Sequence, residues 1–297
     1  MKKTKIICDS TCDLLNVRNI NEKNFLDLLV KRDVDFVALS VVINGIPYQD
    51  AKDITVEGLF QTIKETKGKP STTAVSPGMF LEIFNKYLQE GYEVLYISIS
   101  SEISGTYNSS LLAREALDDL KSMVHIVDGR NLSTGTGLLV LKACDLRDLG
   151  YSAQAIKEQI DQIKNNVRCQ FGISTLEYLY RGGRASGLTF FVSKFLRIKP
   201  ILLVKSGHII AGDKIIGKTE KTILRQFEYF LKDYQNGLVD PEYVFFTHCL
   251  APDLFKYVEE LFKKHEIKIN HIYETWAGSV ISTHCGPGTL GIIYCLK

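Results

Sequence analysis

The stretch VLYISISSEISGTYNSS, residues 94–110, decides the fold class of this chain. Residues 94–98 form a short run of mostly apolar or β-branched residues, which is typical of a buried strand. The polar segment 99–110 follows at once, and a serine such as Ser104 commonly caps the free backbone amides of a helix start. A buried strand that leads through a polar turn into a helix is the repeating unit of an open parallel sheet, so we predict an α/β fold.

The same unit recurs elsewhere in the first half of the chain. We expect further strands at residues 5–8, 36–43 and 124–127, and helices at residues 79–89 and 104–120, where apolar residues return at helical spacing. Strands that alternate with helices predict a parallel sheet with helices on both faces.

The second half shows a different pattern. The segment IKPILLVKSGHIIAGDKI, residues 198–215, is typical of two strands joined by a turn at Ser206 and Gly207, which indicates antiparallel pairing. We therefore predict two α/β domains: residues 1–165 with the parallel sheet, and residues 166–297 with a mixed sheet.

Bulk composition excludes several classes of function. Of 297 residues, 36 are basic and 34 acidic, and this net charge of +2 predicts neither nucleic acid nor an anionic membrane as the main partner. The seven cysteines are odd in number and include no C-x-x-C pair, so we expect reduced thiols. No signal peptide or run of about 18 apolar residues is present. We expect a cytoplasmic protein without stable membrane insertion.

One motif suggests an enzyme. Residues 212–219, GDKIIGKT, match the phosphate-binding pattern G-x-x-x-x-G-K-[ST]. Ile215 and Ile216 favour extended backbone over the turns that gather amides around a phosphate, so we expect a hairpin that leads into a helix. A kinase or phosphatase of a small metabolite that uses this loop remains the alternative.

Two other patterns in the sequence indicate no further chemistry, and a third motif is absent. The sequence GPGTLG, residues 286–291, lacks a following helix, because only six residues remain and they are typical of a strand. The adjacent pairs His248–Cys249 and His284–Cys285 do not have the spacing of zinc ligands, so we expect no metal. G-x-S-x-G, the serine hydrolase motif, does not occur.

Hydroxyl-rich turns at residues 69–78, 99–110 and 282–291 form the candidate site. Polar groups after the strands of a parallel sheet lie at its ligand-binding edge. An isolated turn of this kind is more often a helix cap, but three of them with one histidine suit a clamp for a small carboxylate or phosphate. No nucleophile, base and acid occur together, so we expect no catalytic residues.

Seven motifs in this order resemble the DegV family of bacterial fatty-acid-binding proteins, and together they span nearly the whole chain. They are IICDSTCDL, STTAVSPGMF, SISSEISGTYNSS, VDGRNLSTGTGLLV, LEYLYRGGRAS, LRIKPILLVKSGHI and THCGPGTLGI.

The resemblance implies a lipid site between two α/β domains that buries one long-chain fatty acid, such as palmitate, and needs no cofactor. It further implies a carrier that presents the carboxylate to the catalytic subunit of a separate fatty acid kinase, for acyl-phosphate formation and phospholipid synthesis. The carboxylate-binding positions of the family match Thr72, Ser104 and His284, with Thr73 and Arg184 as secondary positions.

This chain departs from the family at one loop, where Ala74 and Val75 replace the usual Gln and Pro of T-S-Q-P. The departure affects the expected loop shape. A lipid-sensing regulator is a further alternative that the same motifs allow.

Overall fold

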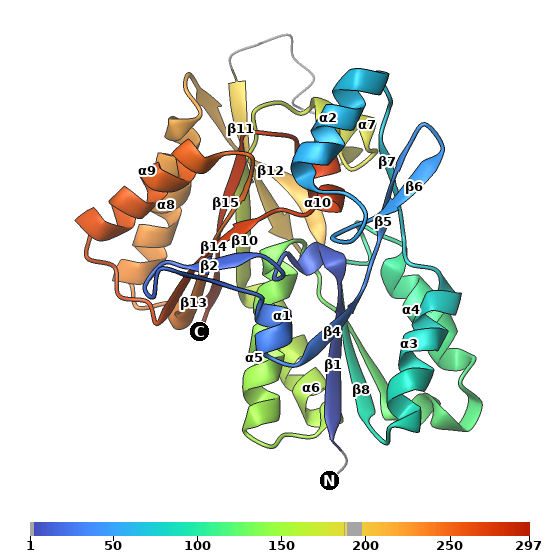
Figure 1. The fold of residues 1–297 in the computed structure, drawn as a ribbon. Coiled ribbons are helices and arrows are strands. Elements are labelled where there is room, and N and C mark those ends of the chain that lie inside the picture. The colour runs from blue at the N-terminus through green and yellow to red at the C-terminus, as the bar shows by residue number, and fades with distance from the viewer. Residues whose placement is uncertain (1–2, 187, 189–197) are drawn as a thin grey trace.

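A parallel four-stranded sheet, sheet A, forms the lower half of the molecule in Figure 1. The computed structural model describes residues 3–186, 188 and 198–297. Strand order in sheet A is β4 (Val34–Val37), β1 (Thr4–Asp9), β8 (Glu93–Ser98) and β9 (Val124–Asp128). All three neighbouring pairs are parallel, as the alternation of strands and helices predicts.

Helices cover both faces of sheet A because its strands are apolar on both sides. Ile6 and Ile97 pack toward one face, whereas Ile7 and Tyr96 pack toward the other. The first face is covered by α5 (Thr134–Asp148) and α6 (Ala153–Ile163), with α1 (Leu28–Lys31) at the edge strand β4. The second is covered by α3 (Pro77–Gln89) and α4 (Thr106–Glu115), on the right in Figure 1.

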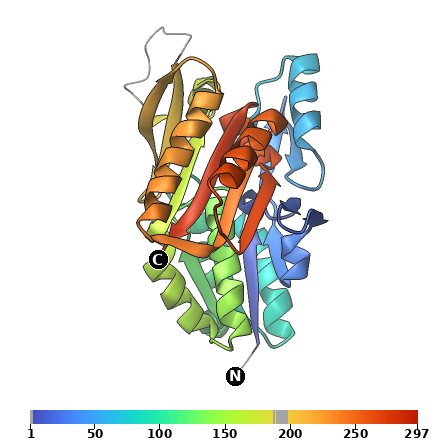
Figure 2. The same ribbon diagram turned by 90° about the vertical axis from the view of Figure 1, so that its left-hand side faces the viewer.

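An eight-stranded mixed sheet, sheet B, forms the other half. Its order is β12 (His208–Ile216), β11 (Ile198–Lys205), β10 (Val167–Gly172), β15 (Thr289–Leu296), β13 (Val239–Cys249), β14 (His271–Trp276), β2 (Val17–Asn19) and β3 (Asn24–Leu26). Among the strands of sheet B that the structure describes, β13 and β14 alone pair in parallel. Helices α8 (Glu220–Gln235) and α9 (Pro252–Lys264) cover its outer face, toward the viewer in Figure 2.

A small antiparallel sheet, sheet C, lies beside the junction of the two halves. It has the order β6 (Ile46–Gln49), β5 (Ser40–Ile43) and β7 (Ser71–Thr73). Near it are α2 (Val56–Thr66) and α10 (Ser279–Cys285), and α10 in turn contacts α7 (Glu177–Arg181). Short 3₁₀ turns occupy Ser10–Cys12, Asp118–Met123 and Lys164–Asn166.

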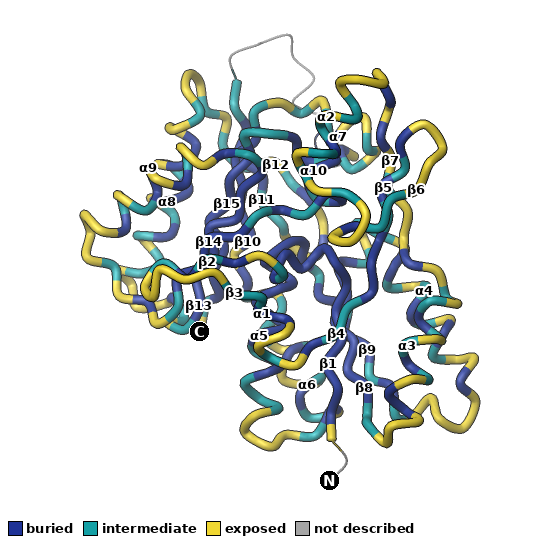
Figure 3. The backbone as a smooth tube through the Cα atoms, in the orientation of Figure 1, coloured by how far each residue is buried: buried dark blue, intermediate teal, exposed yellow. Residues whose placement is uncertain are grey.

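Helix α5 lies between the two large sheets. It contacts β1 and β8 on one side and β10, β13 and β15 on the other. Ten of its 15 residues are buried, as expected for a helix that has apolar neighbours all round. Figure 3 shows the strands of both sheets as mostly buried, whereas the helices at the periphery carry exposed stretches. The core therefore runs from sheet A through α5 to sheet B.

Most predicted elements are confirmed, and two need correction. The predicted strand at residues 36–43 is two strands, β4 and β5, which belong to different sheets. The predicted helix at 104–120 ends earlier, because α4 stops at Glu115 and a 3₁₀ turn follows. Periodicity alone shows neither break, since the residues at both remain apolar or helix-compatible.

The motif at residues 212–219 forms no phosphate loop. Residues 212–216 lie in β12, which pairs antiparallel with β11, and α8 begins at Glu220. The predicted hairpin is confirmed. Likewise, GPGTLG leads into strand β15.

Pairing of β2 with β14 places residues 17–26 in sheet B, so the chain crosses between the two halves more than once. The boundary near residue 165 remains a prediction. No helix among the described residues is long and apolar enough to cross a bilayer.

We expect Gly137→Ala to destabilise the protein by about 1 to 3 kcal/mol, the range for overpacking a core. A Cβ at Gly137 on α5 would lie 2.6 Å from the backbone oxygen of Cys12, which cannot move aside like a side chain. The matched control is Gly78→Ala on α3, where the nearest atom would be 3.9 Å away. Urea unfolding checks this, and equal stability of the two variants would contradict it.

Candidate functional site

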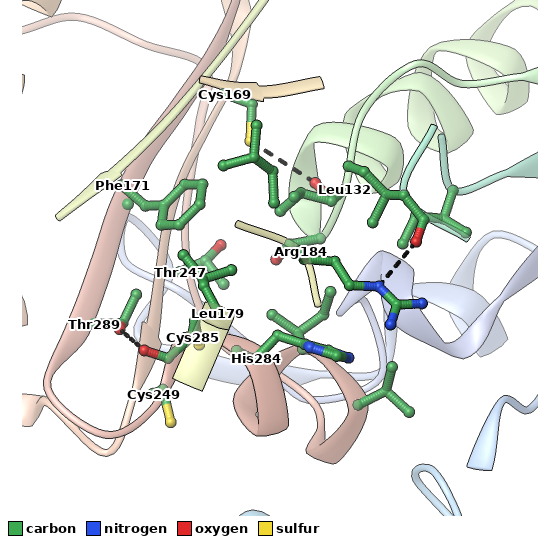
Figure 4. A pocket seen from close by; sticks show the side chains of 18 of the residues that line it. Leu132, Cys169, Phe171, Leu179, Arg184, Thr247, Cys249, His284, Cys285 and Thr289 are labelled. Atoms are coloured by element: carbon green, nitrogen blue, oxygen red, sulfur yellow. Dashed lines mark hydrogen bonds between the residues drawn. The ribbon is translucent and has the colours of Figure 1, made fainter. Parts of the chain in front are cut away.

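A narrow apolar pocket lies where the carboxyl end of sheet A meets the inner face of sheet B (Figure 4). Its walls come from the loops that follow the strands of sheet A, the start of α5, the inner face of sheet B, α7 and α10. They include Ile99, Leu132, Phe171, Leu179, Ile209, Ile281 and Ile293. The space between the walls, with the part open to solvent, is about 790 Å³, but the centre of a water molecule can occupy only about 70 Å³ of it. Closely spaced walls of this kind suit an unbranched apolar chain.

Polar side chains gather at one part of this pocket. Thr72 from β7, Ser104 from the loop before α4, Arg184 after α7 and His284 on α10 all line it. The Thr72 hydroxyl and Nε2 of His284 are 2.8 Å apart and form a hydrogen bond. The structure therefore brings together four of the five predicted residues from segments that lie up to 212 positions apart.

Thr73 lies apart from this cluster. Successive residues of a strand point to opposite faces, so Thr73 is exposed on β7 while Thr72 is half-buried and reaches the pocket. The serine after it, Ser76, has the alternative role considered for these turns: it caps α3 by accepting a hydrogen bond from the Met79 amide.

His284 is neutral near pH 7. Burial lowers its pKa to about 4, and the positive charge of Arg184 acts in the same direction. Its Nδ1 is buried and has no hydrogen-bond partner among the described residues. A Cβ on Gly182 would collide with this ring nitrogen, so the first glycine of RGGR makes room for the imidazole. Gly183 serves a different need, because its φ of +71° is in the left-handed region.

The Arg184 side chain donates hydrogen bonds to backbone carbonyls rather than to an acidic side chain. Its Nε donates to the carbonyl of Ile103 at 3.2 Å, and Nη1 donates to the carbonyl of Gly182 at 2.7 Å. The neighbouring Glu177 pairs with Arg181. Arg184 thus fixes the segment just before Ser104, whose hydroxyl is itself 2.9 Å from that of Thr106.

Buried carboxylates of the DSTCD motif position the site, a role that residue patterns did not reveal. Asp9 accepts hydrogen bonds from the Ile99 amide at 2.8 Å and the Tyr96 hydroxyl at 3.0 Å, which fixes the end of β8. Asp13 accepts from the Gly278 amide at 2.8 Å, directly before α10. Burial raises the pKa of both carboxyls.

Asp50 completes this arrangement from the loop after β6. One carboxyl oxygen accepts from the Ser279 amide at 2.7 Å and from the Val280 amide at 3.3 Å. Burial raises its pKa to about 6. A Cβ on Gly278 would lie 3.2 Å from oxygens of both Asp13 and Asp50, so glycine is needed where the two acids meet the helix start. A single aspartate between Gln49 and Ala51 gives no recognisable signal in the sequence.

His248, the second histidine that lines the pocket, is a buried residue whose two ring nitrogens both have hydrogen-bond partners. His248 accepts from the Ala251 amide through Nδ1 at 3.3 Å, so Nε2 carries the proton and donates to Glu274 at 3.2 Å. Beside it, Thr247 exchanges hydrogen bonds with Thr134 at 2.5 Å and Thr275 at 2.7 Å. These polar groups find partners within the protein, which leaves the deep part of the pocket apolar in character.

Fold and pocket together define a class of α/β proteins that enclose a narrow apolar cavity between a parallel and a mixed sheet. This chain belongs to the DegV family, since the model of that family of uncharacterised proteins matches residues 3–297. The resemblance drawn from the seven motifs is confirmed.

Individual relatives match over their full length. A DegV domain-containing protein of Clostridium acetobutylicum is 32% identical over 297 residues, 100% of both chains. A solved DegV family protein of Thermus thermophilus, described as fatty acid binding, has a TM-score of 0.87 at 28% identity and covers 99% of this chain and 100% of its own. DegV of Bacillus subtilis, described as a fatty acid binding protein, has a TM-score of 0.83 at 27% identity, with 100% of both chains covered.

We expect His284 to make stability depend on pH. Because its pKa is about 4 in the fold and 6.5 ordinarily, the unfolded chain takes up the proton first as pH falls. The contribution of the neutral His284 to the free energy of unfolding is complete above pH 6.5 and is lost as the pH falls toward 4, on the order of 3 kcal/mol in total. Urea unfolding of wild type and His284→Gln at several pH values isolates this contribution. Parallel stability curves for the two proteins would show that the imidazole is not buried as described.

Proposed function

We propose that this protein binds one long-chain fatty acid, with the acyl chain in the apolar pocket and the carboxylate at Thr72, Ser104 and His284. The observation that carries the proposal is the junction of a narrow apolar slot with a cluster of hydroxyls and one neutral histidine. The Thermus thermophilus and Bacillus subtilis relatives, both described as fatty acid binding, support it.

Affinity in such a site comes mainly from the tail. Burial of a sixteen-carbon chain at roughly 0.8 kcal/mol per methylene gives a gross gain on the order of 10 kcal/mol. A hydrogen bond to the charged head contributes roughly 1.5 to 3 kcal/mol, much of which is offset by desolvation. The polar cluster therefore sets the direction in which the ligand lies.

The Thr72–His284 hydrogen bond suits a carboxylate acceptor. Because the pKa of His284 is low, one ring nitrogen carries a proton and the other does not. With the proton on Nε2, the ring donates to the Thr72 oxygen, and the threonine hydroxyl is free to donate to the carboxylate. This tautomer leaves Nδ1 as a bare acceptor, in keeping with its position against Gly182, where a proton would have no acceptor. Ser104 offers a second neutral donor, and Arg184 supplies positive charge nearby.

We further propose that the protein is a carrier without turnover of its own, and that a separate kinase phosphorylates the bound carboxylate. The position of Arg184 supports this proposal, because Arg184 lines the acyl pocket and also an outer cleft that Lys205 and His208 line as well. From there it can reach both the bound carboxylate and a partner at the surface. The rival kinase or phosphatase is disfavoured, since residues 212–216 are extended in β12. A lipid-sensing regulator would use the same site, with the bound lipid as its signal.

We expect Thr72→Val and Ser104→Ala to keep the fold and weaken fatty acid binding by about 1 to 3 kcal/mol each, because each removes one donor to the carboxylate. Ser71→Ala is the matched control, since Ser71 is exposed on the same strand as Thr72. Mass spectrometry of an organic extract gives the bound lipid, and palmitate titration gives the affinities. Wild-type protein that neither carries nor saturably binds a fatty acid would disprove the proposal.

We expect Arg184→Gln to retain bound fatty acid and to lower acyl-phosphate formation at least tenfold when a fatty acid kinase and ATP are supplied. The reason is that glutamine keeps polar contact with backbone carbonyls but loses the charge and fork suited to a phosphoryl group. Thermal melting and lipid content serve as controls. A variant that unfolds or loses its lipid would assign Arg184 a structural role, and acyl-phosphate formation without any kinase would refute the carrier.

A further inference from the structure

A second cleft, distinct from the acyl pocket, opens between the first residues of β10 and the end of β11. Its cavity volume is about 580 Å³, within the range of roughly 300–1,000 Å³ found for small-molecule sites. Cys169 lines both this cleft and the acyl pocket, so one residue of β10 separates the two. Fatty acid binding makes no use of this cleft, although Lys205 also lines the outer cleft beside Arg184.

The cleft exists because two neighbouring strands separate. The register between β10 and β11 joins residues 170–172 with residues 201–203. Residues 167–169 of β10 and residues 204–205 of β11 lie beyond the last pair and line the cleft. Its walls are thus two strand edges that do not pair with each other, which present backbone hydrogen-bonding groups to a ligand.

Five cationic side chains from five separate segments surround this opening. They are Arg130 from the loop after β9, Lys164 from the 3₁₀ turn Lys164–Asn166, Arg168 from β10, Lys205 from the end of β11 and Lys232 from α8. Asp233 is the one acid that lines the cleft among residues 3–186, 188 and 198–297. Convergence of cations from both halves of the molecule on a concave surface concentrates positive potential there.

Existing ion pairs leave much of this charge available. Lys164 is 2.7 Å from Asp161, and Arg130 is 3.0 Å from Glu102, so both are held in place. Arg168 is 3.9 Å from Asp233 and its side chain is 49% exposed. Lys205 and Lys232 are exposed and have no ion pair within the part of the chain that the structure describes. Three cations are therefore free, or nearly free, to meet an anion.

We propose that this cleft binds a small polyanion of the polyphosphate class, whose charges are spaced along a chain. Spaced charges match cations that approach from several elements, whereas a single phosphate can meet only some of them. The concave shape favours a small ligand over a flat acidic protein surface. Among the described residues that line the cleft, both tyrosine hydroxyls already donate, Tyr229 to Asp213 and Tyr294 to Asp233, so neither is free to recognise a nucleobase. The phosphate chain is thus the recognised unit.

The test is calorimetric titration of the full chain with tripolyphosphate and with orthophosphate at low ionic strength. We expect one saturable site, and tripolyphosphate to bind at least about tenfold more tightly, because linked charges engage several cations at once. The double variant Lys205→Gln/Lys232→Gln should weaken tripolyphosphate binding about tenfold or more and leave fatty acid content unchanged. ATP should bind as tripolyphosphate does.

A control with the same net charge is Lys64→Gln/Lys256→Gln, which removes two exposed lysines from α2 and α9, away from the cleft. It should bind tripolyphosphate as the wild type does. Equal loss in both double variants would show attraction to overall charge and overturn the proposal. The proposal would also be overturned by a lack of saturable binding, by a preference for orthophosphate, or by ATP that binds at least tenfold more tightly than tripolyphosphate. Polyglutamate is titrated as a polyanion without phosphate, and binding of polyglutamate alone would overturn the proposal as well.

Discussion

Buried carboxylates that accept hydrogen bonds from backbone amides hold this site together. Asp13 and Asp50 accept hydrogen bonds from three successive amides at the start of α10, and Asp9 accepts one from the amide directly after β8. Burial disfavours their charged forms, as the raised pKa values show, so the protein bears a cost for this arrangement. Directional hydrogen bonds that backbone amides donate to a carboxyl group fix a helix start more narrowly than apolar packing can. Through these bonds, α10 brings His284 to Thr72.

Helix α5 imposes the second constraint, because one helix is shared by two sheets. Its apolar residues must fill both faces, and Gly137 must allow the backbone of residue 12 to approach. The shared helix keeps the sheets at one spacing, and the acyl pocket occupies the edge of this interface where sheet A's loops reach sheet B. The Arg130 guanidinium donates to the Ser206 carbonyl, and the Ser100 hydroxyl donates to the Gly207 carbonyl. These two hydrogen bonds anchor the β11–β12 hairpin over the same edge. Pocket shape therefore depends on backbone contacts far from the polar cluster.

Sequence patterns predicted the strands of sheet A, the antiparallel hairpin and the polar turns because each depends on neighbours in the chain. The strand at 36–43 was wrong since the same β-branched composition suits two short strands of different sheets. Thr73 matches the family motif as Thr72 does, but strand alternation turns its side chain outward. The neutral state of His284 was not foreseen, because burial, which lowers its pKa, is a property of the folded surroundings.

By itself, the sequence determined the α/β class, the family and the hydroxyl-rich turns, because local periodicity, turn chemistry and motif order are written along the chain. Tertiary structure alone decided which of those hydroxyls meet. Thr72 and His284 are 212 positions apart, and their hydrogen bond requires three sheets, α10 and the carboxylates of Asp13 and Asp50 to be in place. The same holds for the cationic cleft, whose five charges lie on five segments and have no shared pattern. Contacts between distant segments depend on packing geometry, and no short stretch of sequence encodes that geometry.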